Sequence, residues 1–404
     1  MRMGSGPAGA LWSRSHNSGA AMTDSFEILE RLVAFPTISR EPNLDLIHYV
    51  QSLLESHGIA STLVRSEDGR NANLYATLGP ADRPGVMLSG HSDVVPVAGQ
   101  DWSLPPFSLV ERNGRLHGRG TADMKGFVAC AVHALLRAAE APLQIPMHLA
   151  LSYDEEIGCV GVRRMLDVLE TAPTRPAFCI VGEPTELAVA TGHKGKIAAR
   201  AVCTGKEAHS ALAPTGLNAI HLAADFIAAL RTRQAALAED GAQDGDYDVP
   251  YTTLHAGLIS GGVALNIVPN RCQVDFEIRN LQADDTEQIL AAIRQDADRI
   301  ASAARQQAEE ADIAIEVVNA YPGLDTAPDA EVVSFVKSLR GSNSTIKVSF
   351  GTEGGLFNER LGVPTVICGP GSMAQGHKPD EFVTREQIEL CDQMLDRLIE
   401  RLSA

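Results

Sequence analysis

Histidine and carboxylate residues placed like metal ligands recur along the 404-residue chain. The first group is His91-Ser92-Asp93, which follows the apolar residues 86–90. Because side chains alternate along a strand, His91 and Asp93 should point to the same side, so that the Asp93 carboxylate holds one imidazole nitrogen and a metal binds the other. A lone His-x-Asp pair is more often a buried histidine with a hydrogen-bond partner, so a metal site requires further ligands.

Asp123 is the second candidate ligand. It lies in a glycine-rich run, residues 118–126, directly before a helix predicted over residues 127–140. An anion at this position is stabilised by the helix N-terminus and can also face a cation.

Four more candidates, Glu155, Glu156, Glu183 and His377, follow predicted strands or lie in a loop. In open α/β sheets ligands bind outside the carboxyl ends of the strands, so these side chains should converge. Six ligands are more than a single tetrahedral zinc with an open position uses. Two ions that share a carboxylate would use them, and Asp123 can bridge ions roughly 3.5–4 Å apart.

Glu155 and Glu156 are adjacent in a segment predicted to be extended, so their side chains should point in opposite directions. One of them would bind metal. The other would face the reacting water, take its proton and later pass it to the leaving nitrogen. Their spacing alone does not decide which glutamate has which role.

The composition limits the class of protein. The chain is 45% hydrophobic and 21% charged, as is usual for a soluble globular protein. Its formal net charge of −17 argues against nucleic acid or an anionic membrane as a partner, because either would require a basic face. We find no apolar stretch of the length that crosses a bilayer.

The seven cysteines are odd in number, scattered and without a Cys-x-x-Cys pair. Most lie in apolar runs, so we expect reduced thiols in the core and a cytoplasmic location. Cys159 lies near the candidate ligands in sequence, but we interpret it as a small apolar residue rather than a nucleophile or ligand. Residues 1–21 lack the apolar core of a signal peptide. We expect a disordered extension there, with Met22 as the natural start and a transit peptide as the alternative.

The order of predicted elements divides the chain into two domains. Residues 22–192 and 322–404 alternate between helix and strand, which favours a layered α/β sheet. Residues 193–321 follow the order β-α-β-β-α-β, typical of a two-layer, ferredoxin-like α+β sandwich inserted into the first domain. Within it we predict a helix over residues 218–233 and a mobile loop over residues 235–248.

Five separated motifs resemble the dinuclear zinc peptidase and deacylase family that contains acetylornithine deacetylase, succinyl-diaminopimelate desuccinylase and aminoacylases. They occur in the family's order, with its inserted domain between the fourth and the fifth. The motifs are His91-Ser92-Asp93, Gly118-Arg119-Gly120-Thr121-Ala122-Asp123-Met124-Lys125-Gly126, Asp154-Glu155-Glu156, Gly182-Glu183-Pro184-Thr185 and Gly376-His377.

The resemblance implies a role for each matched position. His91 and Glu183 would bind one divalent ion and Glu156 and His377 the other, with Asp123 between them. The ions would be zinc, with cobalt as the alternative. Glu155 would be the general base, and Asp93 would orient His91.

The resemblance also implies roles for the inserted domain, which would be a lid and dimerisation domain. His209 would reach into the partner subunit of a homodimer and stabilise the developing oxyanion. Asn266 and Arg279 would hold the amide region and the carboxylate of an N-acyl amino acid, for which the guanidinium fork of Arg279 is suited. Gly351 and Thr352 would also contact the substrate.

Three segments, residues 208–214, 251–270 and 349–357, resemble the acetylornithine deacetylase branch most. One departure is Gly354, where that branch would have alanine. The implied activity is hydrolysis of N2-acetyl-L-ornithine to L-ornithine and acetate. The alternatives are another N-acyl-amino-acid deacylase, a desuccinylase, a dipeptidase or a non-catalytic amino-acid-binding protein on this fold.

Overall fold

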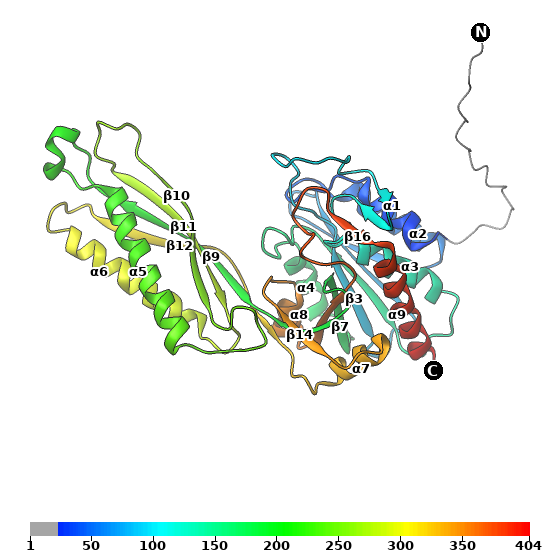
Figure 1. Cartoon of the computed structure of the whole chain (residues 1–404). Helices are drawn as coiled ribbons and strands as arrows, with labels where there is room; N and C mark the ends of the chain where they lie inside the picture. Colours follow the sequence, from blue (N-terminus) through cyan, green and yellow to red (C-terminus); the bar gives the residue numbers. More distant parts are fainter. Residues whose placement is uncertain (1–22) are drawn as a thin grey trace, which may run out of the picture.

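The computed structural model describes residues 23–404. These residues form two domains (Figure 1). The main domain comprises residues 23–194 and 322–404, and the inserted domain, residues 195–321, projects from one side of it. The extension expected over residues 1–21 and the start expected at Met22 lie outside the described residues.

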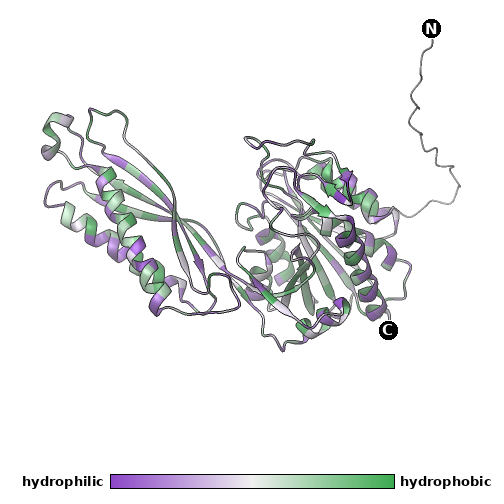
Figure 2. Cartoon of the chain, viewed as in Figure 1, coloured by the Kyte–Doolittle hydropathy of each residue, from purple (hydrophilic) through white to green (hydrophobic). Residues whose placement is uncertain are grey.

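The main domain is built on one mixed sheet with the strand order β1-β2-β6-β3-β7-β15-β8-β13, and β14 pairs with β8. Strands β3, β6, β7 and β15 run parallel at its centre. Figure 2 shows apolar residues along these central strands. The strands of the sheet are β1 (Ser61–Arg65), β2 (Ala72–Leu78), β3 (Val86–His91), β6 (Met147–Ser152), β7 (Phe178–Pro184), β8 (Val189–His193), β13 (Leu324–Asp325), β14 (Thr345–Val348) and β15 (Thr365–Gly369).

Helices cover both faces of this sheet, and the sheet is therefore buried on both sides. Leu88 of β3 packs in one apolar cluster and its neighbour Met87 in another, as the alternation of side chains along a strand requires. The helices on the Leu88 side are α1 (Ser25–Val33), α2 (Leu44–Ser56), α3 (Lys125–Ala138), α7 (Glu331–Arg340) and α9 (Arg385–Ser403). Those on the Met87 side are α4 (Val162–Glu170) and α8 (Gly354–Leu361).

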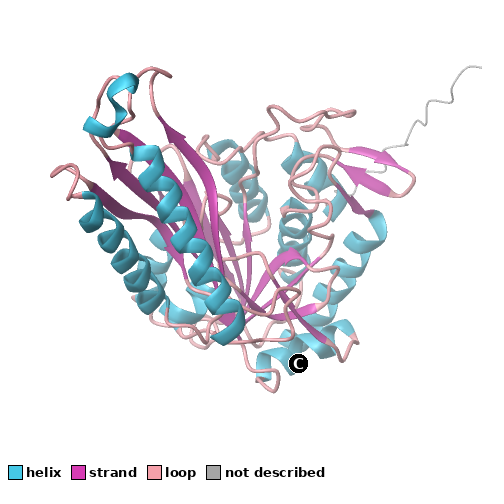
Figure 3. Cartoon of the chain, turned by 60° about the vertical axis from the view of Figure 1, so that its left-hand side comes forward, coloured by secondary structure: helices cyan, strands magenta, loops and turns pink. Residues whose placement is uncertain are grey.

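The inserted domain is a four-stranded antiparallel sheet with the order β10-β11-β9-β12. Two long helices cover one of its faces (Figure 3). Its elements are β9 (Gly195–Thr204), η1 (Ser210–Thr215), α5 (Ala219–Asp240), β10 (Thr253–Gly261), β11 (Arg271–Asn280), α6 (Thr286–Ala304) and β12 (Asp312–Tyr321). The predicted fold class, an α/β domain with an inserted two-layer α+β domain, is confirmed.

The mobile loop predicted over residues 235–248 is wrong in its first part. Helix α5 continues to Asp240, because residues 235–239 are strong helix formers and the first helix-breaking residue is Gly241. The remaining segment contacts the main domain: Lys347 Nζ donates to the Asp244 carboxylate at 2.7 Å, and Tyr247 is buried.

A small sheet, not predicted from the sequence, joins distant parts of the main domain. It has the order β16-β5-β4, with β4 at Val110–Arg112, β5 at Arg115–His117 and β16 at Phe382–Thr384. Its strands are too short to show a clear alternating pattern. The sheet brings the C-terminal segment beside the glycine-rich run that carries Asp123. None of the helices in residues 23–404 has both the length and the apolar character needed to cross a membrane.

Candidate metal centre

The candidate site lies where three parallel strands end. His91 is the last residue of β3, Glu183 lies near the end of β7, and the loop after β6 carries Glu155 and Glu156. Because β3 pairs in parallel with both β6 and β7, their carboxyl ends meet at one edge of the sheet. The fold therefore brings together ligands that are far apart in the sequence.

Two groups of potential ligands share Asp123. In the first, His91 Nε2 lies 3.0 Å from Asp123 Oδ1 and 3.5 Å from Glu183 Oε1. In the second, His377 Nε2 lies 3.1 Å from Asp123 Oδ2 and 2.9 Å from Glu156 Oε2. Within each group the ligand atoms all lie within 4.8 Å of one another. Each oxygen of Asp123 faces a different group, which is the geometry of a bridging carboxylate.

The structure differs from the prediction at Asp93. The Nδ1 atom of His91 lies 2.9 Å from the backbone oxygen of Asp93 but 3.6 Å from its nearest carboxylate oxygen. Strand β3 ends at His91, so the alternation that the prediction assumed does not extend to Asp93. Because Nδ1 faces a carbonyl acceptor, Nε2 is the nitrogen left for a metal.

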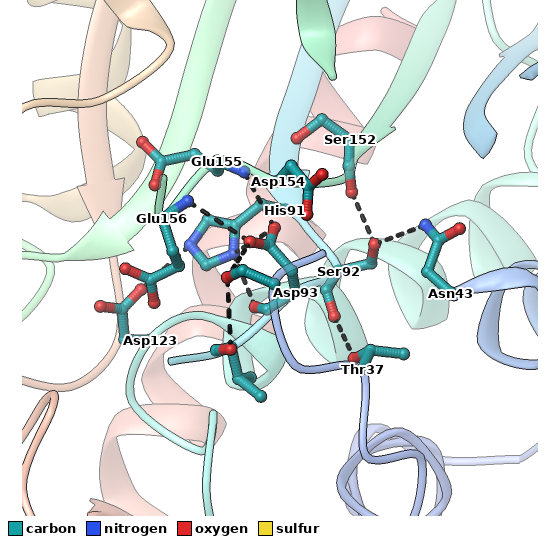
Figure 4. Close-up of polar contacts among 12 residues, drawn as sticks. Thr37, Asn43, His91, Ser92, Asp93, Asp123, Ser152, Asp154, Glu155 and Glu156 are labelled. Atoms are coloured by element: carbon teal, nitrogen blue, oxygen red, sulfur yellow. Dashed lines mark hydrogen bonds and ion pairs between the residues drawn. The ribbon is translucent and has the colours of Figure 1, made fainter. Parts of the chain in front are cut away.

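The Asp93 carboxylate instead holds the glutamate pair. It accepts hydrogen bonds from the backbone amides of Glu155 (3.0 Å) and Glu156 (3.3 Å) and from the Ser39 hydroxyl (2.8 Å). Figure 4 shows the Glu156 side chain directed toward Asp123 and the Glu155 side chain directed away from it. Glu155 is thus free of the two ligand groups and available for another role.

Electrostatics in this space favour bound cations. Burial raises the pKa of Glu183 well above its usual range, and burial together with the Asp123 charge raises the pKa of Glu156 to about 7. Oxygen Oε1 of Glu156 is buried and has no hydrogen-bond partner among the described residues. Several repelling carboxylates, an orphaned oxygen and two imidazoles fit hard or borderline divalent metal ions.

His377 comes from a loop of the C-terminal part of the chain and is 44% exposed at its side chain. Hydrogen bonds to Asp123 and Glu156 raise the pKa of His377 to about 10. Its backbone oxygen accepts a hydrogen bond from the Gln100 side chain at 3.0 Å. The loop that carries His377 is therefore attached to the segment that carries Gln100, and the attachment is at His377 itself.

A buried ion pair that the sequence analysis missed supports the ligand loops. The Arg119 guanidinium donates to the Glu381 carboxylate at 2.7 Å, and both side chains are buried. Glu381 also accepts from the backbone amides of Gly120, Ala122 and Asp123. The sequence signal was an arginine between two glycines just before Asp123, where a buried charge would need a partner.

Glu155 is buried beside this centre. Burial raises the pKa of its carboxyl well above the usual range, and the charges of Glu156 and Glu353 act in the same direction. The Cys159 thiol donates to Glu155 Oε1 at 3.3 Å. A carboxylate with a raised pKa next to a metal site is suited to accept and return a proton. All seven cysteines are buried and free, as expected.

A cavity of about 110 Å³ opens onto most of the candidate metal ligands. Arg279 and Lys196, from the base of the inserted domain, line it and supply positive charge, and Glu277 lies beside both. The residues that line the cavity are Asp123, Glu155, Glu156, Gly158, Glu183, Lys196, Arg279, Tyr321, Phe350, Gly351, Met373 and His377. Lys196 and Tyr321 were not singled out by the sequence analysis.

Two residues of the 349–357 segment have different surroundings. Gly351 lines the cavity, and a Cβ atom there would lie 2.1 Å from the Tyr321 hydroxyl oxygen, so glycine leaves room for this tyrosine. Thr352 is buried outside the cavity lining, and its hydroxyl accepts from the Gly354 amide at 3.0 Å. At Gly354 a Cβ atom would lie 3.1 Å from the Thr352 hydroxyl, so alanine would be tight there.

The structure does not bring His209 and Asn266 to the candidate metal ligands of the same chain. Both are exposed, and they lie together at the outer end of the inserted domain, where the Ser210 amide donates to the Asn266 backbone oxygen at 3.0 Å. The neighbouring helix η1 is the green coil farthest from the main domain in Figure 1. Contact of these residues with a metal centre would require a second subunit or a large movement of the domain.

The fold and the ligand set define the chain as a metallohydrolase with an inserted second domain. It belongs to the peptidase family M20/M25/M40, whose model matches residues 87–401. The acetylornithine deacetylase of Myxococcus xanthus is 36% identical over 379 residues, which cover 92% of this chain and 95% of that protein. That of Pasteurella multocida (strain Pm70) is 32% identical over 384 residues, 92% and 96% of the two chains.

Solved structures share the fold. The M20 family metallo-carboxypeptidase Sso-CP2 of Sulfolobus solfataricus has a TM-score of 0.76 at 19% identity and covers 95% of this chain and 100% of its own. The YXEP protein of Bacillus subtilis, a dinuclear metal-binding peptidase, has a TM-score of 0.65 at 14% identity, with 93% and 96% covered. The family model and the two relatives confirm the family resemblance found in the sequence, and the chain is an enzyme that hydrolyses amide bonds.

Zinc binding to the metal-free protein should release protons near neutral pH. His377 (pKa about 10) is protonated there and Glu156 (pKa about 7) is partly protonated, whereas metal ligands must be deprotonated. Metal binding must remove the proton from His377 and, where it is present, the proton from Glu156, so affinity should decrease as the pH falls from about 8 to about 6. Calorimetry in two buffers of different ionisation enthalpy measures the released protons. The exposed His221→Ala variant should behave as wild type, and pH-independent affinity would contradict the prediction.

Proposed function

We propose that this chain removes the acetyl group from N2-acetyl-L-ornithine and gives L-ornithine and acetate, a reaction of arginine biosynthesis in the cytoplasm. The observation that carries the proposal is the cavity that Glu155 and members of both ligand groups line together with Arg279 and Lys196. An N-acyl amino acid has an amide to hydrolyse and a carboxylate that these cations can bind. The two acetylornithine deacetylases align with this chain over both of its domains.

The proposed centre holds two divalent ions, zinc with cobalt as the alternative. His91, Glu183 and Asp123 would hold one, and Glu156, His377 and Asp123 the other. When bound, such ions act as Lewis acids toward an amide carbonyl and make water a better nucleophile at neutral pH. Asp93 fixes the backbone of Glu155 and Glu156, so the base and a ligand keep a constant separation.

Glu155 is the proposed proton carrier. Its carboxylate takes the proton of the attacking water and gives it to the nitrogen that leaves as the amide bond breaks. Its burial keeps bulk water away from this transfer. Arg279 holds the substrate carboxylate, and the Tyr321 hydroxyl, which accepts from Arg279 at 3.2 Å, orients the guanidinium.

We propose a homodimer formed through the inserted domain. Strand β10 is an edge strand of its sheet and exposes Leu258 and Ile259, while Val263 and Leu265 in the following loop are also exposed. An exposed edge strand with apolar side chains is a template for pairing with another chain. In such a dimer the outer ends of the inserted domains, with His209 and Asn266, would approach the partner's centre.

A panel of substrates tests the reaction. With zinc or cobalt added, kcat/KM should be highest for N2-acetyl-L-ornithine among N-acetyl amino acids, N-succinyl-LL-diaminopimelate and dipeptides, because the acyl and side-chain pockets differ among these activities. A preference of about tenfold or more for a succinyl substrate or a dipeptide would contradict the proposal.

Glu155→Gln should lower kcat by about 100- to 10,000-fold, since glutamine keeps the shape of the side chain but does not carry the proton. Metal content should be unchanged, because Glu155 lies outside both ligand groups. Steady-state kinetics and elemental analysis measure the two effects. Undiminished turnover would refute the role of Glu155.

Mixing His209→Ala protein with Glu155→Gln protein should restore activity through hybrid dimers. Random exchange makes hybrids of half the dimers, and each hybrid has one complete site, so about a quarter of wild-type activity is expected. Native mass spectrometry of subunits of different mass verifies the exchange. No recovery after complete exchange would count against a site shared between subunits.

A further inference from the structure

The base of strand β12 contacts the loop that carries both glutamates of the candidate site. We refer to residues 153–160 as the glutamate loop. Its backbone belongs to the main domain, whereas Asn319 belongs to the last strand of the inserted domain. The half-buried side chain of Asn319 lies against this loop and is therefore a link between the two domains.

Asn319 donates two hydrogen bonds to the glutamate loop. Its Nδ2 atom lies 2.9 Å from the backbone oxygen of Gly158 and 3.3 Å from that of Ile157. Its Oδ1 atom accepts from Arg163 Nη2 at 3.4 Å, and Arg163 Nε donates to the Cys159 backbone oxygen at 3.2 Å. The carbonyls of three consecutive loop residues are thus held by one amide and one guanidinium.

The glutamate loop is shaped to receive this amide. Gly158 has a φ of +111°, a conformation that L side chains rarely adopt. A Cβ atom at Gly158 would lie 1.6 Å from Asn319 Nδ2, so any other residue there would displace the asparagine. Glycine is required at this position both by the backbone and by the contact.

An irregularity in β12 places Asn319 at the contact. The pairing of β12 with β9 shifts register between Val317 and Asn319. A bulge of this kind turns the following side chains out of the regular alternation and often lies next to an active site. The exposed Val318 is the extra residue, and Asn319 is turned toward the main domain.

The contact continues to the Glu155 carboxylate through the loop itself. The amides of Gly158 and Cys159 donate to the Glu155 backbone oxygen at 2.7 and 2.8 Å, and the Cys159 thiol donates to Glu155 Oε1. A shift of the 157–159 backbone would therefore move the carboxylate. Small displacements of a reacting group lower the rate strongly, because proton transfer requires hydrogen-bond distance.

We propose that Asn319 is a positioning residue that holds Glu155 in place through the glutamate loop. The inserted domain thereby contributes to proton transfer through the base of β12 in addition to its contacts with substrate. The inference rests on the proposed role of Glu155 as proton carrier.

The test compares Asn319→Ala with wild type in kinetics, metal content and hydrogen exchange. We expect kcat to fall by about tenfold with KM within about twofold, because the base is misplaced while Arg279 is untouched. Two metal ions should remain bound. Exchange at the amides of residues 158–161 should become faster, since their hydrogen bonds depend on the loop conformation.

Two further variants sharpen this test. Gly158→Ala should likewise lower kcat and speed exchange, because its Cβ atom displaces Asn319; only Asn319→Ala tests KM, since Gly158 lines the cavity. Val318→Ala, at the exposed neighbouring position, should leave kcat and exchange at wild-type values. Asn319→Asp keeps the shape but removes both donors to the loop, so it should resemble Asn319→Ala if the hydrogen bonds hold the loop.

The outcomes separate positioning from general stability. If Asn319→Ala lowers the unfolding temperature but leaves kcat and the exchange of residues 158–161 unchanged, the proposal is wrong. A fall in kcat that added zinc fully reverses would also overturn it, because the effect would then be on metal binding. Exchange does not depend on turnover, so failure of the proposed deacetylase activity would leave this contact testable by itself.

Discussion

Repulsion among buried carboxylates is the constraint on which the structure around the site depends. Asp123, Glu156 and Glu183 converge at the ends of parallel strands, where burial makes their charged forms costly. Two histidines offset part of this cost, and bound cations would offset the rest. The main domain supplies the rigidity that such a cluster requires, with a central sheet buried on both faces and ligands at its strand ends.

Residues outside the ligand groups keep this cluster in shape. Asp93 holds the backbone of the glutamate pair, and the Arg119–Glu381 ion pair holds the run before α3. In both cases a buried carboxylate, that of Asp93 or that of Glu381, accepts hydrogen bonds from backbone amides. Such hydrogen bonds fix a loop more firmly than packing of small side chains would. The loops at the site thus have no regular secondary structure, but hydrogen bonds from their backbone amides to these carboxylates hold them in place.

One end of the inserted domain contacts the site, and the other end lies far from it. At its base, Arg279, Lys196 and Tyr321 line the cavity, and Asn319 meets the glutamate loop. At its outer end, next to η1, His209 and Asn266 are exposed, and η1 lies far from the main domain in Figure 1. Movement of this domain would change both sets of contacts together. In the proposed dimer, movement of one inserted domain would change contacts at the candidate centres of both subunits.

The sequence by itself determined the two-domain fold and which residue types offer candidate ligands in which order, because residue type, periodicity and motif spacing are local properties. It did not determine which atom of Asp93 faces His91, since the strand ends at His91, two residues before Asp93, and the strand alternation does not reach Asp93. It also missed the pairing of Arg119 with Glu381 and the contact of Asn319 with Gly158. These contacts join segments more than a hundred residues apart, and only tertiary packing and the register shift in β12 bring them together.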